Sequence, residues 1–169
     1  MKTFVETDRL LLREYVEEDA EAFFKLNSDP EVLRFVPDQA LLNLEQARQI
    51  LRDHPIADYR KHGFGRGACI LKSTGEQIGF AGLKYLEEVG EVDVAYRLQR
   101  ASWGQGLATE AALASVRYGF ADLGLKRIIG LAMPENIASV RVLEKIGLRQ
   151  AGTVTFWGRQ FSKYMIARG

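Results

Sequence analysis

The sequence predicts an α/β fold with a mixed central sheet and helices on both of its faces. Apolar runs of strand length alternate along the chain with segments of helical periodicity. The chain has 169 residues, of which 47% are hydrophobic, and this length is expected of one domain covering residues 1–169. A G-x-G turn also joins an apolar strand to the start of a helix.

Prolines and glycines mark where several of the expected elements end. Pro30 ends the first helix, because proline disfavours a helical conformation in the residue before it. Asn43 and Gln46 have the spacing of a capping box at the start of the second helical region, which Pro55 should bend or split and Gly63 should close. The expected elements are a strand over 9–14, a helix over 18–27, a helical region over 41–61, strands over 67–72, 77–84 and 91–98, a helix over 107–123, a strand over 127–132, a helix over 136–146, and strands over 148–154 and 161–167.

Composition and charge argue against several classes of function. The net charge is +1, so there is no case for a nucleic-acid or membrane partner. Cys69 is the only cysteine, and His54 and His62 lie outside any ligand-like cluster, which argues against disulfides and a metal site. Without a visible signal peptide or long apolar stretch, the expected location is cytoplasmic. A monomer or a homodimer is expected.

The segment WGQGLATEA, residues 103–111, is the most informative motif in the chain. Its glycines, Gly104 and Gly106, tolerate φ values that turn successive backbone N–H groups toward one point. The following helix start adds unpaired N–H donors, and a phosphate or pyrophosphate group fits such a site. A plain strand-to-helix turn is the alternative. Thr109 excludes a Rossmann fingerprint, which needs glycine or alanine there, and no Walker motif is present.

Four segments, spread in order over nearly the whole chain, carry a resemblance to a known family. They are TDRLLLREYVEEDAEAFF, VDVAYRL, WGQGLATEA and ENIASVRVLEKIGL. Together they resemble the GNAT superfamily of acetyl-CoA-dependent N-acetyltransferases, and within it the branch that includes the ribosomal-protein N-terminal (RimJ/RimL-like) acetyltransferases. The resemblance implies a mostly antiparallel central sheet with helices on both faces, acetyl-CoA as cosubstrate, an amine as acceptor and no metal.

The resemblance also assigns residues to the cosubstrate. The backbone of the glycine turn would cradle the CoA pyrophosphate, and Trp103 would pack beside it unless it is a core aromatic. Two residues depart from the family pattern: Ala101 replaces the usual Arg or Gln before the turn, and Leu143 replaces the tyrosine that often protonates the leaving thiolate. Backbone N–H groups near Tyr96 and Leu98 would polarise the thioester carbonyl. The implied cosubstrate-binding residues are Tyr96, Leu98, Trp103, Gly104, Gln105, Gly106, Leu107, Ala108, Thr109, Asn136 and Ser139.

Three side chains are candidates for catalysis, and two of them have a structural alternative. Asp93 matches a carboxylate position of the N-terminal acetyltransferase branch and could take the proton of the amine, or it could be a solvated residue on the polar face of its strand. Asn136 could be a plain helix N-cap, whereas the resemblance implies a hydrogen bond to the pantetheine arm. Ser139 would lie near the thioester sulfur and could assist the departing thiolate.

The sequence therefore predicts transfer of an acetyl group to a primary amine in a ternary complex. An α-amino group, with a pKa of about 8, is roughly a tenth neutral at pH 7, whereas a lysine side chain is almost entirely protonated. We expect a protein or peptide N-terminus as the acceptor. The alternatives are a small amine, such as a polyamine, an amino acid or an aminoglycoside, and a non-catalytic CoA-binding sensor, which Ala101 and Leu143 would fit.

Overall fold

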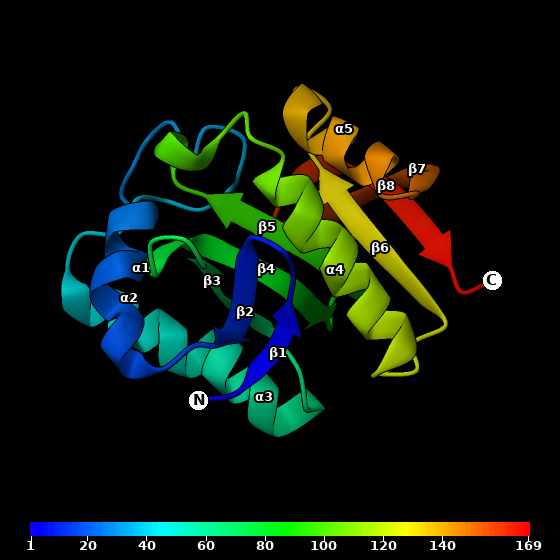
Figure 1. The fold of residues 1–169 in the computed structure, drawn as a ribbon. Coiled ribbons are helices and arrows are strands. Elements are labelled where there is room, and N and C mark those ends of the chain that lie inside the picture. The colour runs from blue at the N-terminus through cyan, green and yellow to red at the C-terminus, as the bar shows by residue number, and fades with distance from the viewer.

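The computed structural model describes residues 1–169 and contains one mixed sheet of eight strands (Figure 1). The strand order is β1-β2-β3-β4-β5-β6-β8-β7, and all neighbours are antiparallel except β5 and β6, which run parallel. This confirms the predicted mixed, mostly antiparallel α/β architecture. The strands are β1 (Thr3–Glu6), β2 (Leu10–Glu14), β3 (Arg66–Leu71), β4 (Glu76–Leu86), β5 (Glu91–Leu98), β6 (Arg127–Ala132), β7 (Arg149–Phe156) and β8 (Arg159–Ala167).

Helices cover both faces of the sheet, as Figure 1 shows. One face carries α1 (Ala20–Leu26), α2 (Leu44–Leu51) and α3 (Ala57–His62). The other face carries α4 (Leu107–Ala121) and α5 (Ile137–Lys145). Three short helical turns complete the chain: η1 (Glu17–Asp19), η2 (Arg52–Ile56) and η3 (Arg100–Ser102).

The two faces of β5 differ in character, because successive side chains of a strand point to opposite sides. Val92 and Val94 pack in an apolar cluster with residues of α4 and α5. Ala95 packs instead against the cluster formed by α1 and α2, so its face of β5 also carries Asp93 and Arg97. Both sides of the sheet therefore have an apolar core, and the α1–α3 side also holds the charged side chains of β5.

The packing of α5 depends on a glycine in the neighbouring strand. Leu143 of α5 is 1% exposed, and a Cβ atom on Gly130 of β6 would overlap its side chain. Leu143 therefore belongs to the core on this face of the sheet.

The first strand and the middle helical region differ from the prediction. Strand β1 was not predicted, because it has only four residues and a single buried side chain, Val5. The region expected over 41–61 consists of α2, the π-helical turn η2 around Pro55, and α3. Asn43 caps α2 by accepting the N–H of Gln46, as predicted. The side-chain oxygen of Gln46 accepts the N–H of Leu42, one residue before the cap, instead of that of Asn43.

Candidate active site

The site begins where the pairing of two parallel strands ends. Strands β5 and β6 are in register at one position only, Asp93 opposite Ile129. β5 continues to Leu98 and pairs with β4 along its whole length. The backbone of β5 beyond Asp93 therefore has no strand partner on the β6 side. Polar backbone groups left in this way need another partner, either a ligand or water.

The glycine turn lies just after this unpaired stretch of β5. Gly104 and Gly106 have φ angles of 74° and 77°, in the left-handed region that favours glycine. Gly106 is the N-cap residue of the 15-residue helix α4, and no side chain caps the helix. The N–H groups of Leu107, Ala108 and Thr109 consequently have no intrahelical acceptor. The turn therefore has the backbone geometry that the motif predicts, and the binding of an anion there stays a prediction.

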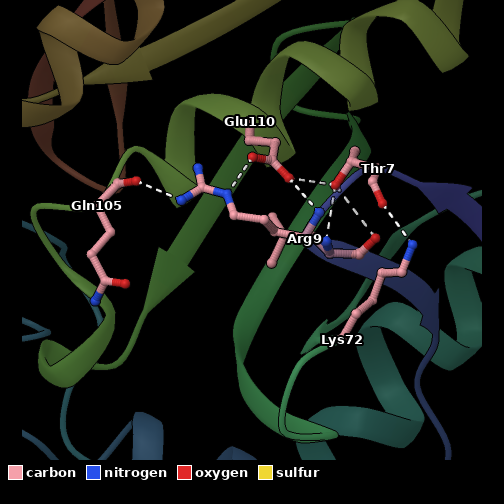
Figure 2. A network of polar contacts seen from close by, with 6 residues as sticks. Thr7, Arg9, Lys72, Gln105 and Glu110 are labelled. Atoms are coloured by element: carbon pink, nitrogen blue, oxygen red, sulfur yellow. Dashed lines mark hydrogen bonds and ion pairs between the residues drawn. The ribbon is translucent and has the colours of Figure 1, made fainter.

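Arg9, from the connection between β1 and β2, holds this turn from outside (Figure 2). Its Nη1 donates to the carbonyl oxygen of Gln105 at 2.9 Å, and its Nε donates to Glu110 at 2.8 Å. The N–H of Arg9 and the hydroxyl of Thr7 also donate to Glu110, at 3.1 and 2.6 Å. The side chain of Lys72 ties the same connection to β3 through the carbonyl oxygen of Thr7.

This network orients the turn and offsets a negative charge beside it. In a trans peptide the C=O and N–H groups point in opposite directions, so the bond from Arg9 to Gln105 turns the N–H of Gly106 away from Arg9. Burial alone would raise the pKa of Glu110, but hydrogen bonds from Thr7 and Arg9 outweigh it and hold that pKa below its usual range. The ion pair with Arg9 at 2.8 Å balances this carboxylate in the first turn of α4.

Trp103 lies beside the turn and is not a core aromatic. It is 48% exposed, and its Nε1 donates to the carbonyl oxygen of Leu98 at 2.8 Å. This bond satisfies one of the backbone groups that the end of β5 leaves unpaired. Of the two alternatives predicted for Trp103, the position beside the turn is therefore the one observed.

Tyr96, Ser139 and Asn136 come together at the start of α5. The hydroxyl of Tyr96 donates to the carbonyl oxygen of Ser139 at 3.0 Å and lies 3.1 Å from the Ser139 hydroxyl. Asn136 caps α5, because its Oδ1 accepts the N–H of Ser139 at 3.2 Å. The capping alternative is thus confirmed, and the Asn136 Nδ2 group remains free of the cap. Burial raises the pKa of Tyr96 above its usual range, so the phenol carries its proton at neutral pH.

Asp93 is buried, so of its two alternatives the solvated side chain is wrong. The residue is 5% exposed, because β5 lies inside the sheet and helices cover this face. Burial raises the pKa of Asp93 to about 6, against the opposing attraction of Arg66. The Nη2 atom of Arg66 lies 3.4 Å from the Asp93 Oδ2. A carboxylate with this pKa is mostly ionised at pH 7 and is a stronger base than an ordinary aspartate.

The candidate residues therefore divide between the two faces of the sheet. Tyr96 and Ser139 meet on the α4 and α5 side, near the glycine turn, whereas Asp93 points to the α1–α3 side. No hydrogen bond joins Asp93 to Asn136 or Ser139. These groups flank the point where the pairing of β5 with β6 ends.

At the two positions that depart from the family pattern, Leu143 and Ala101, other residues supply the missing hydroxyl and cation. Leu143 is buried against Gly130 in the core, and the hydroxyl nearest to Ser139 comes from Tyr96 instead. Ala101 lies in η3, and its carbonyl oxygen accepts the Gln105 amide at 3.1 Å. The cation at this turn comes from Arg9, more than ninety residues earlier in the chain.

Sequence reasoning missed the contributions of Arg9, Arg66 and the Tyr96 side chain. Arg9 and Glu110 each lie within a motif that carries the family resemblance, TDRL and ATEA. That coincidence was the available signal, but their contact depends on a fold that brings the first strands next to α4. Arg66 had no comparable signal.

Comparisons with known proteins agree with this geometry. A family model described as "Acetyltransferase (GNAT) domain" matches residues 9–149. The uncharacterized N-acetyltransferase p20 of Bacillus licheniformis is 33% identical over 167 residues, which cover 95% of this chain and 93% of that protein. The chain therefore belongs to the GNAT acetyltransferase family.

Two solved structures share the fold at lower identity. RimL, described as a ribosomal L7/L12 alpha-N-protein acetyltransferase in complex with coenzyme A, has a TM-score of 0.83 and 16% identity, with 98% of each chain covered. AAC(6')-Ib in complex with ribostamycin and coenzyme A has a TM-score of 0.79 and 20% identity, with 95% of this chain and 94% of that chain covered. These likenesses concern the fold. None of the helices of the present chain has the length and apolar character required to cross a membrane.

Proposed function

We propose that the protein transfers the acetyl group of acetyl-CoA to the α-amine of a protein or peptide N-terminus. The observation that carries this proposal is the position of Asp93. It is a buried carboxylate with a raised pKa, and it stands at the last position where β5 pairs with β6. A base at this point is next to the unpaired backbone of β5, where a thioester carbonyl can be bound.

Acetyl-CoA fits the residues on the α4 and α5 side. The unpaired N–H groups of Leu107, Ala108 and Thr109 would bind the pyrophosphate, with Arg9 fixing the turn from behind. Backbone N–H groups between Tyr96 and Leu98 would polarise the thioester carbonyl. The free amide of Asn136 would donate to the pantetheine arm.

In the reaction, the neutral amine attacks the thioester carbonyl carbon, the new C–N bond forms and the C–S bond breaks. Asp93 accepts the proton that the amine nitrogen loses, directly or through water. The CoA thiolate takes a proton from the pair of hydroxyls on Ser139 and Tyr96, which regains it from solvent water, while Asp93 releases its own proton to solvent. This pair does the work that a tyrosine at the position of Leu143 does in many relatives.

The strength of the base favours an α-amine. An α-amino group with a pKa of about 8 is roughly a tenth neutral at pH 7, so a base with a pKa of about 6 need only remove the proton released during attack. A lysine side chain would first have to lose a proton that it holds far more tightly. The description of RimL as an alpha-N-protein acetyltransferase supports the same acceptor.

Two other functions remain to be separated from this one by experiment. A small amine is the second candidate acceptor, supported by the ribostamycin complex of AAC(6')-Ib, and a CoA-binding sensor would show no turnover. We would measure release of free CoA thiol from acetyl-CoA with a panel of N-terminal peptides, amino acids, polyamines and aminoglycosides. We expect the peptides to give the highest kcat/KM. Faster turnover of a small amine would contradict the N-terminal assignment, and no thiol release with any amine would indicate a sensor.

A further inference from the structure

Three cationic side chains lie on the Asp93 side of the sheet. Arg66 of β3 is in register with Gly82, and Gly82 is in register with Ala95 of β5. Lys84 of β4 is directly opposite Asp93, and Arg97 is on the same face of β5. The carboxylate proposed as the base is thus set among positive charges.

Lys84 and Arg97 are already paired with carboxylates. The Lys84 Nζ lies 2.6 Å from Asp58 of α3. Arg97 donates to Asp38 at 2.8 Å and also to the side-chain oxygen of Asn27. These contacts tie β4 and β5 to the helical face, so both cations have a structural partner.

Arg66 has only a long contact to a carboxylate. Its one charged contact is the 3.4 Å approach of Nη2 to Asp93, which is long for a charge-assisted hydrogen bond. Its Nε atom is buried and has no hydrogen-bond partner. The guanidinium rests over the Phe80 ring, 5.5 Å from its centroid, and the side chain keeps 30% exposure. An arginine has five N–H donors, and most of those on Arg66 are unused.

We infer that Arg66 binds a carboxylate of the acceptor, next to the amine that Asp93 receives. This inference rests on the proposed function, because it takes Asp93 as the group that meets the amine. The short distance between Arg66 and Asp93 requires the carboxylate to lie within a few bonds of the amine. Two acceptors meet this requirement: a peptide whose first residue is aspartate or glutamate, and a free amino acid.

Electrostatics in this part of the molecule oppose a polycationic acceptor. A polyamine or aminoglycoside that places one amine at Asp93 brings further ammonium groups close to Arg66, and like charges at such distances repel. A carboxylate at Arg66 instead forms a charge-assisted contact with planar guanidinium donors, which match carboxylate geometry.

The test compares acceptors that differ only in charge. We would measure kcat/KM by thiol release for peptides beginning with aspartate or asparagine, and with glutamate or glutamine. Free glutamate and its α-amide form a separate arm that identifies the α-carboxylate as the group bound, and spermidine serves as a polycation. We expect at least one acidic acceptor to exceed its amide by about tenfold or more, equivalent to about 1.4 kcal/mol.

Variants of Arg66 test whether its side chain causes the preference for acidic acceptors over their amides. Arg66→Gln should reduce the ratio of acidic to amide acceptor to within about twofold, and Arg66→Lys should retain part of it, with KM for acetyl-CoA unchanged. Arg127→Gln is the matched control, because Arg127 also pairs with a carboxylate of β5, Glu91 at 2.7 Å, at the far end of that strand. A change of Arg66 that alters Asp93 affects the acidic acceptor and its amide equally. The ratio of their kcat/KM values therefore reports only the binding of the carboxylate.

Equal use of acidic and amide acceptors by the natural protein would overturn the inference. So would an unchanged preference in Arg66→Gln, or spermidine as the best acceptor. Thiol release without an acidic preference contradicts this inference and leaves the acetyltransferase proposal standing. No thiol release with any amine contradicts both.

Discussion

A single aspartate, Asp93, is the proposed base of this site. Asp93 is 5% exposed, and burial raises its pKa to about 6. A base must be ionised at the working pH and still hold a proton well, and a pKa just below neutrality satisfies both conditions. Burial of an ionised carboxylate destabilises the folded state, but here it gives Asp93 the pKa that its proposed role requires.

Asp93→Asn tests this role, because asparagine has a similar shape and cannot accept the proton. We expect kcat to fall by about 10²-fold or more while the affinity for acetyl-CoA is nearly unchanged. In the natural protein kcat/KM should rise with pH through about 6. The loss in the variant should shrink at high pH, where the amine is already neutral. Steady-state kinetics from pH 5 to 9 measure these effects, and an identical profile in the two proteins would remove Asp93 from the mechanism.

The hydroxyls of Tyr96 and Ser139 are the second residue-scale test. If they protonate the departing thiolate, Tyr96→Phe and Ser139→Ala should each lower kcat and leave KM for acetyl-CoA within about twofold, since the effect arises in the transition state. Ser115→Ala, which removes a buried hydroxyl bonded to the carbonyl oxygen of Ala111 in α4, is the control. Normal turnover in both site variants would mean that water supplies this proton.

Local sequence predicts those features of the candidate site that the backbone forms. The glycine turn and the Asn136 cap depend on residues within three or four positions, and both are observed as predicted. Side-chain environments could not be predicted in this way. Alternation with Val92 and Val94 suggested a polar, solvated face for Asp93, but whether a strand face is solvated depends on helices placed elsewhere in the chain.

At the scale of elements, the turn before α4 is the proposed binding site for the pyrophosphate of the cosubstrate. Gly104→Val tests it, and Gly158→Val in the β7–β8 turn is a matched control. Both glycines have φ near 70°, and an added Cβ atom at either one would meet nothing within 4 Å. The backbone strain is therefore similar, and only Gly104 adjoins the unpaired N–H groups of α4.

We expect Gly104→Val to weaken acetyl-CoA binding by more than about tenfold, or about 1.4 kcal/mol, because the side chain occupies the approach to the turn. Gly158→Val should leave this affinity unchanged. Calorimetric titration measures both. Equal affinities in the two variants, or no binding by the natural protein, would show that the turn is a plain connection between β5 and α4.

In most of the chain the spacing of hydrophobic residues predicts the helices and strands. It does not do so for β1 or for the helical region around Pro55. The strand β1 has four residues and one buried side chain, which is too short for an alternating pattern to stand out. Its position at the sheet edge depends on pairing with β2. Near Pro55 the chain keeps its helical path by widening into a π-helical turn, so that the proline interrupts the helix without ending it.

At the scale of the whole molecule, the site is assembled from segments that lie far apart in sequence. Arg9 precedes the helix it supports by about a hundred residues, and Arg66 reaches Asp93 across two strand pairings. The candidate groups on the two faces of the sheet lie around the point where the pairing of β5 with β6 ends. The fold therefore places a buried, titratable carboxylate in a central strand, and we expect its ionisation to lower the stability of the folded state.

That cost should appear as a pH-dependent difference in stability between the natural protein and Asp93→Asn. Well below pH 3.8, the ordinary pKa of an aspartate, Asp93 is protonated whether the chain is folded or unfolded, and its ionisation contributes nothing to stability. Between there and about pH 6 the unfolded chain loses this proton first, so the folded state becomes relatively less stable as pH rises. Above about pH 6 the full penalty, about 3 kcal/mol, is present.

Asparagine cannot ionise, so the Asp93→Asn protein escapes this penalty. The quantity to compare is the free energy of unfolding of the variant minus that of the natural protein. We expect this difference to increase by up to about 3 kcal/mol from pH 4 to pH 7. Urea unfolding of both proteins at several pH values measures the difference, in which the titration of all other groups cancels. A difference that stays constant would mean that Asp93 has an ordinary pKa. A difference that decreases with pH would mean that Arg66 stabilises the ionised carboxylate by more than burial destabilises it.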